Sequence, residues 1–359
     1  MLRFPIPLFL AGLVLPAAAQ SRPAPTRIEV APGIHLFQTE PYGDAGLDGN
    51  SVAIVSTDGV LVFDANGTPA AAAAVLAEIR RITDQPVRYL VLSHWHWDHW
   101  YGAEVYREAF PNLVIVSQEK TRVLMAGPAI AFNQPGLDVQ LPGHIDEVDA
   151  ARAKASDTSA ARLERHVAAD RWFLAQKRSV HHTLATLTFT DSLTIHLGER
   201  EIRLRHHDRA ITPGDTYLYL PNDRVVITGD LLINPITFAL FCYPAGWIAT
   251  LDQIARLDFA TLIPGHGAPL RDRTLLAATT DLLRREYAVV RDTRGGGGTV
   301  DQARATVLAD SAVRRLRGII TGGDARMDPA FDLYLVDWFV RRAWQELAGP
   351  LDDSIPATP

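Results

Sequence analysis

Residues 93–100 (Ser-His-Trp-His-Trp-Asp-His-Trp) constrain this chain more than any other segment. They follow residues 89–92, a short apolar run typical of a strand that is buried on both faces. Within six residues the segment holds four side chains of the kind that bind metals, namely His94, His96, Asp98 and His99. Imidazole nitrogens and carboxylate oxygens are common ligands of Zn²⁺, so this loop predicts a metal centre at the end of a strand.

The spacing of these side chains indicates two neighbouring metal positions. In an extended segment alternate residues share a face, so His94 and His96 point the same way. A turn into a following helix aims Asp98 and His99 at a second, adjacent point. The alternative is a polar strand end with hydrogen-bonded histidines, and four ligand-type residues in this order disfavour it.

Two residues later in the chain are also of the kind that bind metals. Asp230 follows a glycine at the end of an apolar strand, where a lone carboxylate is costly unless it is paired or metal-bound. His266 lies between two glycines in the stretch Pro-Gly-His-Gly. Either residue alone fits an ordinary turn equally well, whereas their order after the histidine-rich loop favours a shared metal site.

The histidine-rich loop resembles the H-x-H-x-D-H signature of the metallo-β-lactamase superfamily. Further landmarks occur in the expected order, namely residues 49–51, Asp64, and residues 212–215, 228–230 and 264–267. The resemblance covers about residues 30–270. It implies an α+β fold, a four-layer αββα sandwich, with two metal ions at one edge of the sheets.

The resemblance also implies a role for each ligand-type residue. His94 and His96 would bind the first metal, and Asp98, His99 and His266 the second. Asp230 would bridge both metals, so Asp98 and Asp230 are the expected catalytic carboxylates. Two metals roughly 3.5–4 Å apart share a hydroxide at neutral pH and polarise a scissile bond.

One position departs from the family pattern. A histidine is expected directly before residues 212–215, and this chain has Ile211 there, which cannot bind a metal. His206, His207 or Asp208 in the same loop would be substitutes, although solvated side chains are the simpler interpretation. We therefore expect one or two Zn²⁺ ions per chain, with tighter binding at Asp98, His99 and His266.

Outside the region of resemblance the pattern becomes helical. Residues 20–271 are expected to form the sandwich domain, with a helical insertion at about 118–178. The first part of that insertion contains Pro128, Pro135 and Pro142 and is expected to be irregular. Residues 272–359 predict a helical extension, in which residues 331, 334, 335, 338 and 339 form an apolar face.

The first residues predict export. Residues 1–19 combine Arg3, an apolar stretch and Ala17–Ala19, as in a cleaved signal peptide. The stretch is too short for a spanning helix, which needs about 20 apolar residues. We therefore expect a periplasmic or secreted protein without a stable membrane anchor after cleavage.

Composition narrows the class of partner. The net charge of −6 gives no basic field for nucleic acid, and the single cysteine, Cys242, excludes an intrachain disulfide. A small-molecule substrate is therefore expected, whereas the oligomeric state is not determined by the sequence.

The leading hypothesis is a zinc-dependent hydrolase that uses metal-bound hydroxide on an ester, lactone or thioester carbonyl. A bridging aspartate at position 230 favours these substrates over β-lactams, whereas export favours a β-lactamase, which is the first alternative. The second is a non-catalytic metal- or ligand-binding protein, suggested by Ile211.

Overall fold

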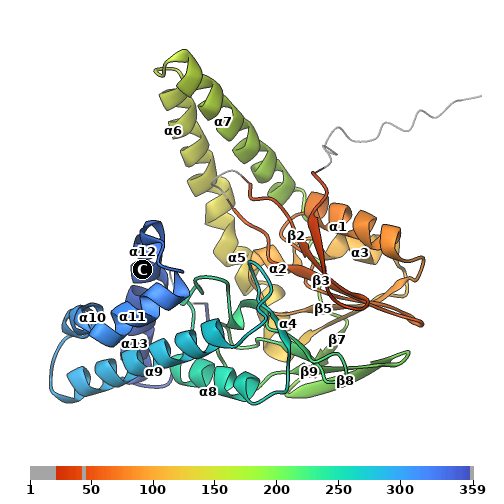
Figure 1. Cartoon of the computed structure of the whole chain (residues 1–359). Helices are drawn as coiled ribbons and strands as arrows, with labels where there is room; N and C mark the ends of the chain where they lie inside the picture. Colours follow the sequence, from red (N-terminus) through yellow and green to blue (C-terminus); the bar gives the residue numbers. More distant parts are fainter. Residues whose placement is uncertain (1–21, 43–45, 356–359) are drawn as a thin grey trace, which may run out of the picture.

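A computed structural model describes residues 22–42 and 46–355, so the expected signal peptide at residues 1–19 lies outside the described residues. The described residues form two β-sheets (Figure 1). The seven-stranded sheet contains, in order, β1 (Thr26–Ala31), β2 (Ile34–Gln38), β3 (Ser51–Ser56), β4 (Gly59–Phe63), β5 (Val87–Leu92), β6 (Val114–Gln118) and β7 (Leu187–Phe189). The five-stranded sheet has the order β12 (Thr261–Ile263), β11 (Val225–Ile227), β10 (Tyr217–Leu220), β9 (Arg200–Arg205) and β8 (Ser192–Leu197).

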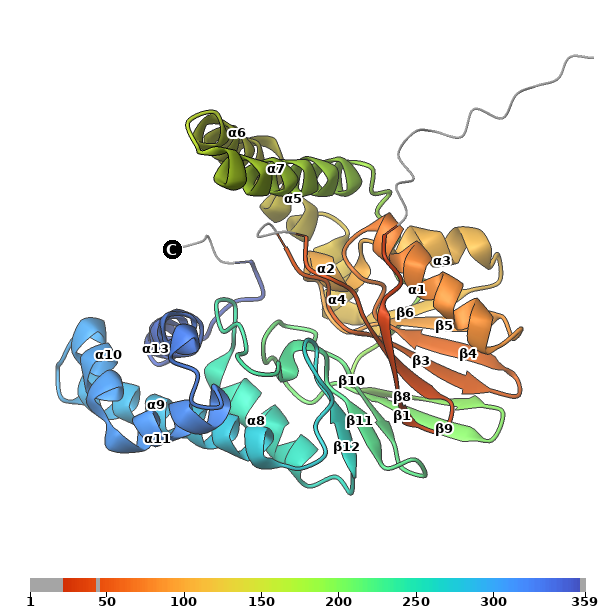
Figure 2. The same ribbon diagram turned by 45° about the horizontal axis from the view of Figure 1, so that its top comes forward.

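The two sheets stack face to face and helices cover their outer faces (Figure 2). A core of alternating side chains fills the space between the sheets, for example Ile54 and Val91 from one and Leu218 and Ile263 from the other. Helices α1 (Pro69–Ile82) and α3 (Ala103–Ala109) pack on the seven-stranded sheet. Helices α8 (Pro244–Ala255) and α9 (Thr274–Gly295) pack on the five-stranded sheet, which confirms the αββα sandwich.

Parallel pairing brings the ligand-bearing loops to one edge. Strands β4 and β5 are parallel, and so are β11 and β12. Their carboxyl ends therefore open on the same side of each sheet. Asp64 follows β4, the histidine-rich loop follows β5, Asp230 follows β11 and His266 follows β12. The strand order thus collects side chains that are up to about 200 residues apart in sequence.

The segment after β6 is helical from Glu119 to Arg178, apart from turns at residues 126–127 and 153–156, which corrects the expectation of an irregular first part. It contains α4 (Glu119–Met125), α5 (Pro128–Pro135), a π-helical turn (Gly136–Gln140), α6 (Leu141–Arg152) and α7 (Asp157–Arg178). Pro128 stands in the first turn of α5, where a helix tolerates proline because no N–H bond is lost. Pro142 is the second residue of α6 and directly follows the π-helical turn. Pro135 ends α5 at the π-helical turn. Helices α6 and α7 form an antiparallel hairpin that projects from the sandwich (Figure 1).

The chain after α9 is also helical. It contains α10 (Val300–Ala309), α11 (Ser311–Ile320), a 3₁₀ turn (Ala325–Met327), α12 (Asp328–Ala330), a π-helical segment (Phe331–Asp337) and α13 (Trp338–Glu346). Phe331, Leu335 and Phe339 are fully buried in the core that also contains α8 and α9, as their spacing predicts. Among the described residues, no helix has the length and apolarity that crossing a membrane requires.

Candidate metal centre

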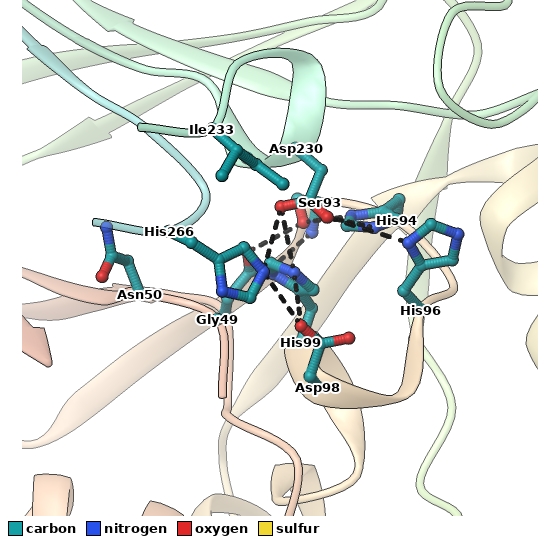
Figure 3. Close-up of polar contacts among 12 residues, drawn as sticks. Gly49, Asn50, Ser93, His94, His96, Asp98, His99, Asp230, Ile233 and His266 are labelled. Carbon is teal, nitrogen blue, oxygen red and sulfur yellow. Dashed lines mark hydrogen bonds and ion pairs between the residues drawn. The ribbon is translucent and has the colours of Figure 1, made fainter. Parts of the chain in front are cut away.

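Two groups of potential metal ligands lie side by side at the sheet edge (Figure 3). The first group contains His94, His96 and Asp230, and the second contains Asp98, His99 and His266. Within each group the ligand atoms lie within 4.8 Å of one another. The chain turns from β5 into the single-turn helix α2 (Trp97–Trp100), and this turn separates the two histidines of the first group from Asp98 and His99.

Asp230 faces both groups with different oxygens. Its Oδ2 atom lies 3.6 Å from His94 Nε2 and 3.8 Å from His96 Nδ1. Its Oδ1 atom lies 3.3 Å from His99 Nε2 and 3.4 Å from His266 Nε2. The carboxylate is therefore oriented to bridge two cations, one in each group.

The second group is arranged around Asp98. The Oδ2 atom of Asp98 lies 3.2 Å from His99 Nε2 and 3.1 Å from His266 Nε2. All three side chains are largely buried. Three converging donors of this kind match the three-ligand sites that hold catalytic zinc with an open fourth position.

The hydrogen bonding of these atoms tests whether a metal fits. Within the described part of the chain, His94 Nε2, His99 Nε2 and Asp230 Oδ1 are buried and have no hydrogen-bond partner. Leaving a buried polar atom unsatisfied costs about 1–3 kcal/mol, so such atoms rarely converge without a reason. A cation held between them removes this cost, and the residues present therefore fit a metal centre.

The protonation states of His94 and Asp230 also suit metal binding. Burial, together with the neighbouring His99 and His96, lowers the pKa of His94 to about 3, so its imidazole is neutral. Burial alone would raise the pKa of Asp230, but His99 and His266 hold it well below the ordinary value. Neutral imidazole and ionised carboxylate are the forms that bind metals.

A second layer of residues orients the ligands. Asp64 Oδ2 lies 2.7 Å from His99 Nδ1, and the same carboxylate accepts hydrogen bonds from the Ser93 amide and hydroxyl at 2.7 and 2.8 Å. In its metal-binding form, His99 would donate its Nδ1–H to Asp64, which leaves the Nε2 lone pair directed at the second group. In the sequence, Asp64 is only a landmark of the resemblance, and its role as an orienting residue emerges from the structure.

Close backbone approach requires glycine beside the ligands. A Cβ atom on Gly49 would lie 2.4 Å from His99 Cε1, and one on Gly265 would lie 2.0 Å from Asp230 Oδ1. Asn50 fixes the neighbouring loop, because its Nδ2 donates to the carbonyls of Pro264 and Gly267 at 2.9 Å each. The landmarks at residues 49–51 and 264–267 therefore have a direct function in shaping the site.

Comparison with known proteins identifies the family. The family model described as "Metallo-beta-lactamase superfamily" matches residues 44–266. This chain belongs to the metallo-β-lactamase superfamily. The matched residues contain both ligand groups and Asp64, so the expectation of a metal-dependent hydrolase of this superfamily is confirmed at the level of the family.

Individual relatives in the superfamily differ in their named substrates. The chain is 25% identical over 251 residues to a linear primary-alkylsulfatase from Pseudomonas sp. (strain ATCC 19151), an alignment that covers 67% of this chain and 45% of the relative. It therefore spans about half the length of that curated relative.

Solved structures of the superfamily show the same fold. A metallo-β-lactamase from Pontibacter korlensis has a TM-score of 0.52 at 15% identity, covering 72% of this chain and 99% of the other. A double mutant of the sec-alkyl sulfatase PisA1 has a TM-score of 0.58 at 18% identity, covering 85% of this chain and 51% of the other.

The structure also places the position at which this chain departs from the superfamily pattern. Ile211 is fully buried in the apolar core with Tyr217 and Trp247. His207 and Asp208 are exposed, and His206 Nδ1 hydrogen-bonds the Asp215 carbonyl at 2.9 Å. None of these substitutes joins either ligand group among the described residues. The asymmetric centre inferred from Ile211 stays a prediction.

Asp215 is the additional acidic group near the first position. It is buried, and its carboxylate accepts hydrogen bonds from the Thr212 amide and hydroxyl at 2.7 and 3.0 Å. Burial, with a contribution from the charge of Asp230, raises its pKa to about 7. In the sequence Asp215 is only the last residue of the Thr-Pro-Gly-Asp landmark, and nothing there reveals its proximity to Asp230.

A row of aromatic rings extends from the first ligand group. This aromatic wall consists of Trp95, Phe132, Phe238, Phe241, Tyr334 and Trp338. It begins beside His96, whose ring centroid lies 4.5 Å from that of Trp95 and 5.4 Å from that of Phe241. It continues through Phe238, 4.4 Å from Trp338 in the C-terminal helices. The site is therefore polar at the ligands and apolar on one side.

Proposed function

We propose that this chain is a zinc-dependent hydrolase with two metal ions that cleaves an ester bond in a small molecule carrying an apolar group. The observation that carries the proposal is the orientation of Asp230, whose two oxygens face different ligand groups at 3.3–3.8 Å. Two divalent ions, when bound, supply an activated water near neutral pH and polarise the scissile ester.

The protein's own residues have distinct tasks in this proposal. Asp98 and Asp230 hold negative charge at the centre, while Asp64 fixes the tautomer of His99 through the 2.7 Å contact to its Nδ1 atom. The half-buried members of the aromatic wall, Phe132, Phe238, Tyr334 and Trp338, provide a surface for an apolar group. Large aromatic side chains contribute strongly to the binding of apolar groups.

A sulfate ester of a long-chain alcohol is the substrate class we favour. Support comes from the 25% identity to a linear primary-alkylsulfatase and from the aromatic wall. Carbonyl esters, lactones and thioesters, the classes expected from the sequence, share the requirement for a polarised oxygen and an activated water. A β-lactam is the alternative, since solved metallo-β-lactamases share the fold.

A panel of substrates tests the proposal. The zinc-loaded protein would be assayed with dodecyl sulfate, ethyl sulfate, a p-nitrophenyl ester, a lactone and nitrocefin, with a His94→Ala variant as the control. We expect zinc-dependent sulfate release that is fastest with dodecyl sulfate. Preferential nitrocefin turnover would replace the proposal with a β-lactamase, and no turnover of any substrate by a zinc-loaded protein would favour a binding protein.

We further propose export to the periplasm or medium, supported by the signal-like pattern of residues 1–19. Cell fractionation with mass measurement of the mature amino terminus tests this. Recovery of the uncleaved chain in the cytoplasm would contradict it.

A further inference from the structure

The projecting hairpin of α6 and α7 contains a third group of potential metal ligands. His144 from α6 and His166 and Asp170 from α7 place one donor atom each within 4.8 Å of one another. His166 and Asp170 are four residues apart, so they lie on the same face of α7, opposite His144. This group, the hairpin site, lies outside the two groups of the candidate metal centre.

Distances in the hairpin site match those of a metal-ligand set. Asp170 Oδ2 lies 3.6 Å from His144 Nε2 and 3.8 Å from His166 Nε2. Asp230 Oδ2 has the same separations, 3.6 and 3.8 Å, from the histidines of the first ligand group. Ligands at 2.0–2.2 Å from a tetrahedral zinc ion are separated from each other by about 3.4 Å. In both sets the ligand atoms are therefore slightly farther apart than they are around a bound zinc ion.

Burial in the hairpin site is graded from inside to outside. The side chain of Asp170 is fully buried, that of His166 is 21% exposed and that of His144 is 45% exposed. The exposed edge at His144 provides an entry path and leaves a fourth position to water.

We propose that the hairpin site binds a divalent transition metal of the zinc type, which clamps α6 to α7. The apolar core that otherwise joins these helices is small, with Ile145, Val167 and Leu174 as its buried members. Structural zinc sites stabilise small helical units in which the apolar core is insufficient. The two imidazoles and one carboxylate favour such an ion over calcium or magnesium, which prefer oxygen ligands.

The clamp is linked to the candidate metal centre through α7. One turn after Asp170, the ring of Phe173 lies 5.5 Å from that of Trp97, which stands between His96 and Asp98. One further turn along, Lys177 Nζ lies 3.4 Å from the centroid of the Trp97 ring. A metal that fixes α7 therefore stabilises the packing of the hairpin against the catalytic loop.

Metal counting tests the inference separately from the proposed function. After zinc loading and gel filtration we expect three zinc ions per chain in the unchanged protein, one for each ligand group. His144→Ala is expected to retain two, whereas the matched variant His196→Ala, at an exposed histidine on β8, is expected to retain three. Equal zinc content in His144→Ala and the unchanged protein would overturn the hairpin site without affecting the proposed hydrolase.

Limited proteolysis provides a second readout, and its comparison of the unchanged protein with and without zinc does not depend on a variant folding. Lys154 is exposed between α6 and α7 and offers a trypsin site. We expect zinc to slow cleavage at Lys154 in the unchanged protein, and not in His144→Ala or His166→Gln. Cleavage of the unchanged protein at the same rate with zinc and after chelation would contradict the clamp.

Discussion

Asp64 and His99 form the contact on which the second ligand group depends, with Asp64 Oδ2 2.7 Å from His99 Nδ1 and both side chains fully buried. Asp64 adopts a left-handed backbone conformation, with φ of 62°, at the end of β4. Its other oxygen accepts the Ser93 amide at 2.7 Å. The carboxylate thus connects the loop after β4 to the loop after β5 and defines which nitrogen of His99 faces the metal.

Replacing Asp64 by asparagine is expected to weaken metal binding. In the variant, the side-chain oxygen of the new asparagine would accept the Ser93 amide, so the side-chain nitrogen would face His99 Nδ1. The proton of His99 would then move to Nε2, which is the atom that should bind the metal. Loss of such an orienting partner costs about 10–100-fold in metal affinity or activity. Competition with a chromogenic chelator measures the zinc affinity.

The matched control is Asp58→Asn, at an exposed aspartate in the turn between β3 and β4. Its zinc affinity should equal that of the unchanged protein. If Asp64→Asn also binds zinc normally, the tautomer of His99 does not depend on Asp64.

A second prediction concerns Gly49. An added Cβ atom would lie 2.4 Å from His99 Cε1, and the nearby Asp98 carbonyl accepts the Gly49 amide at 3.2 Å, so His99 must move. Displacing a reacting group by about 1 Å costs roughly a hundredfold in rate, and we expect that loss in kcat/KM for Gly49→Ala. Gly318→Ala in α11, where the new Cβ meets no atom within 4 Å, should leave activity unchanged. Full activity of Gly49→Ala would show that the site tolerates the shift.

The resemblance of a short local motif predicts the sandwich, and the structure brings the six residues expected to bind metal into two groups. A buried strand followed by H-x-H-x-D-H is compatible with few folds, and β5 and α2 occupy residues 87–92 and 97–100 around this motif. The sequence does not reveal the contact between Asp64 and His99, which joins residues 35 positions apart. Such pairs depend on strand order and register, and a single sequence contains no direct signal for either.

The proline residues and the histidines of the hairpin have roles that depend on helix boundaries and helix packing. Proline breaks a helix in its interior but is favoured in its first turn, so Pro128 fits either interpretation until the helix boundaries are known. The grouping of His144 with His166 likewise requires the antiparallel packing of α6 on α7. At Ile211 the sequence indicates only that a ligand is missing, whereas the structure shows that the side chain is part of the apolar core.

A third prediction tests the aromatic wall. The half-buried Phe238 contacts Trp338 at 4.4 Å and Tyr334 at 5.2 Å between ring centroids, away from the ligands. Aromatic contacts contribute about 0.5–1.5 kcal/mol each, so Phe238→Ala should raise KM for dodecyl sulfate roughly threefold to tenfold. The KM for ethyl sulfate and the zinc content should not change, because the short chain does not reach Phe238.

Phe110→Ala is the control for Phe238→Ala. Phe110 is also half-buried but packs with α1, where Arg80 lies 5.9 Å from its ring centroid. A general effect of losing a phenylalanine would appear in both variants. An equal rise in KM for long and short chains in Phe238→Ala would argue against a role in chain binding.

The last prediction concerns the pH dependence of stability and the buried Glu286 in α9. This side chain is fully buried, and among the described residues neither of its carboxyl oxygens has a hydrogen-bond partner. Burial raises the pKa of Glu286 well above the usual value of 4.5, so the folded protein keeps this carboxyl protonated at pH values where the unfolded chain ionises it. Its contribution to stability is therefore fully present below about pH 4.5 and is lost as pH rises toward the raised pKa.

Glutamine has the same shape and stays neutral, so Glu286→Gln should remove this loss. We expect the variant to be more stable than the unchanged protein at pH 8 by at least about 1 kcal/mol, since each pKa unit corresponds to roughly 1.4 kcal/mol. At pH 4.5 the two proteins should have nearly equal free energies of unfolding. Urea unfolding at both pH values measures the difference, with Glu108→Gln, at an exposed glutamate of α3, as the control. An equal destabilisation of Glu286→Gln at both pH values would mean that the carboxyl makes a specific contact in the folded state that an amide cannot replace.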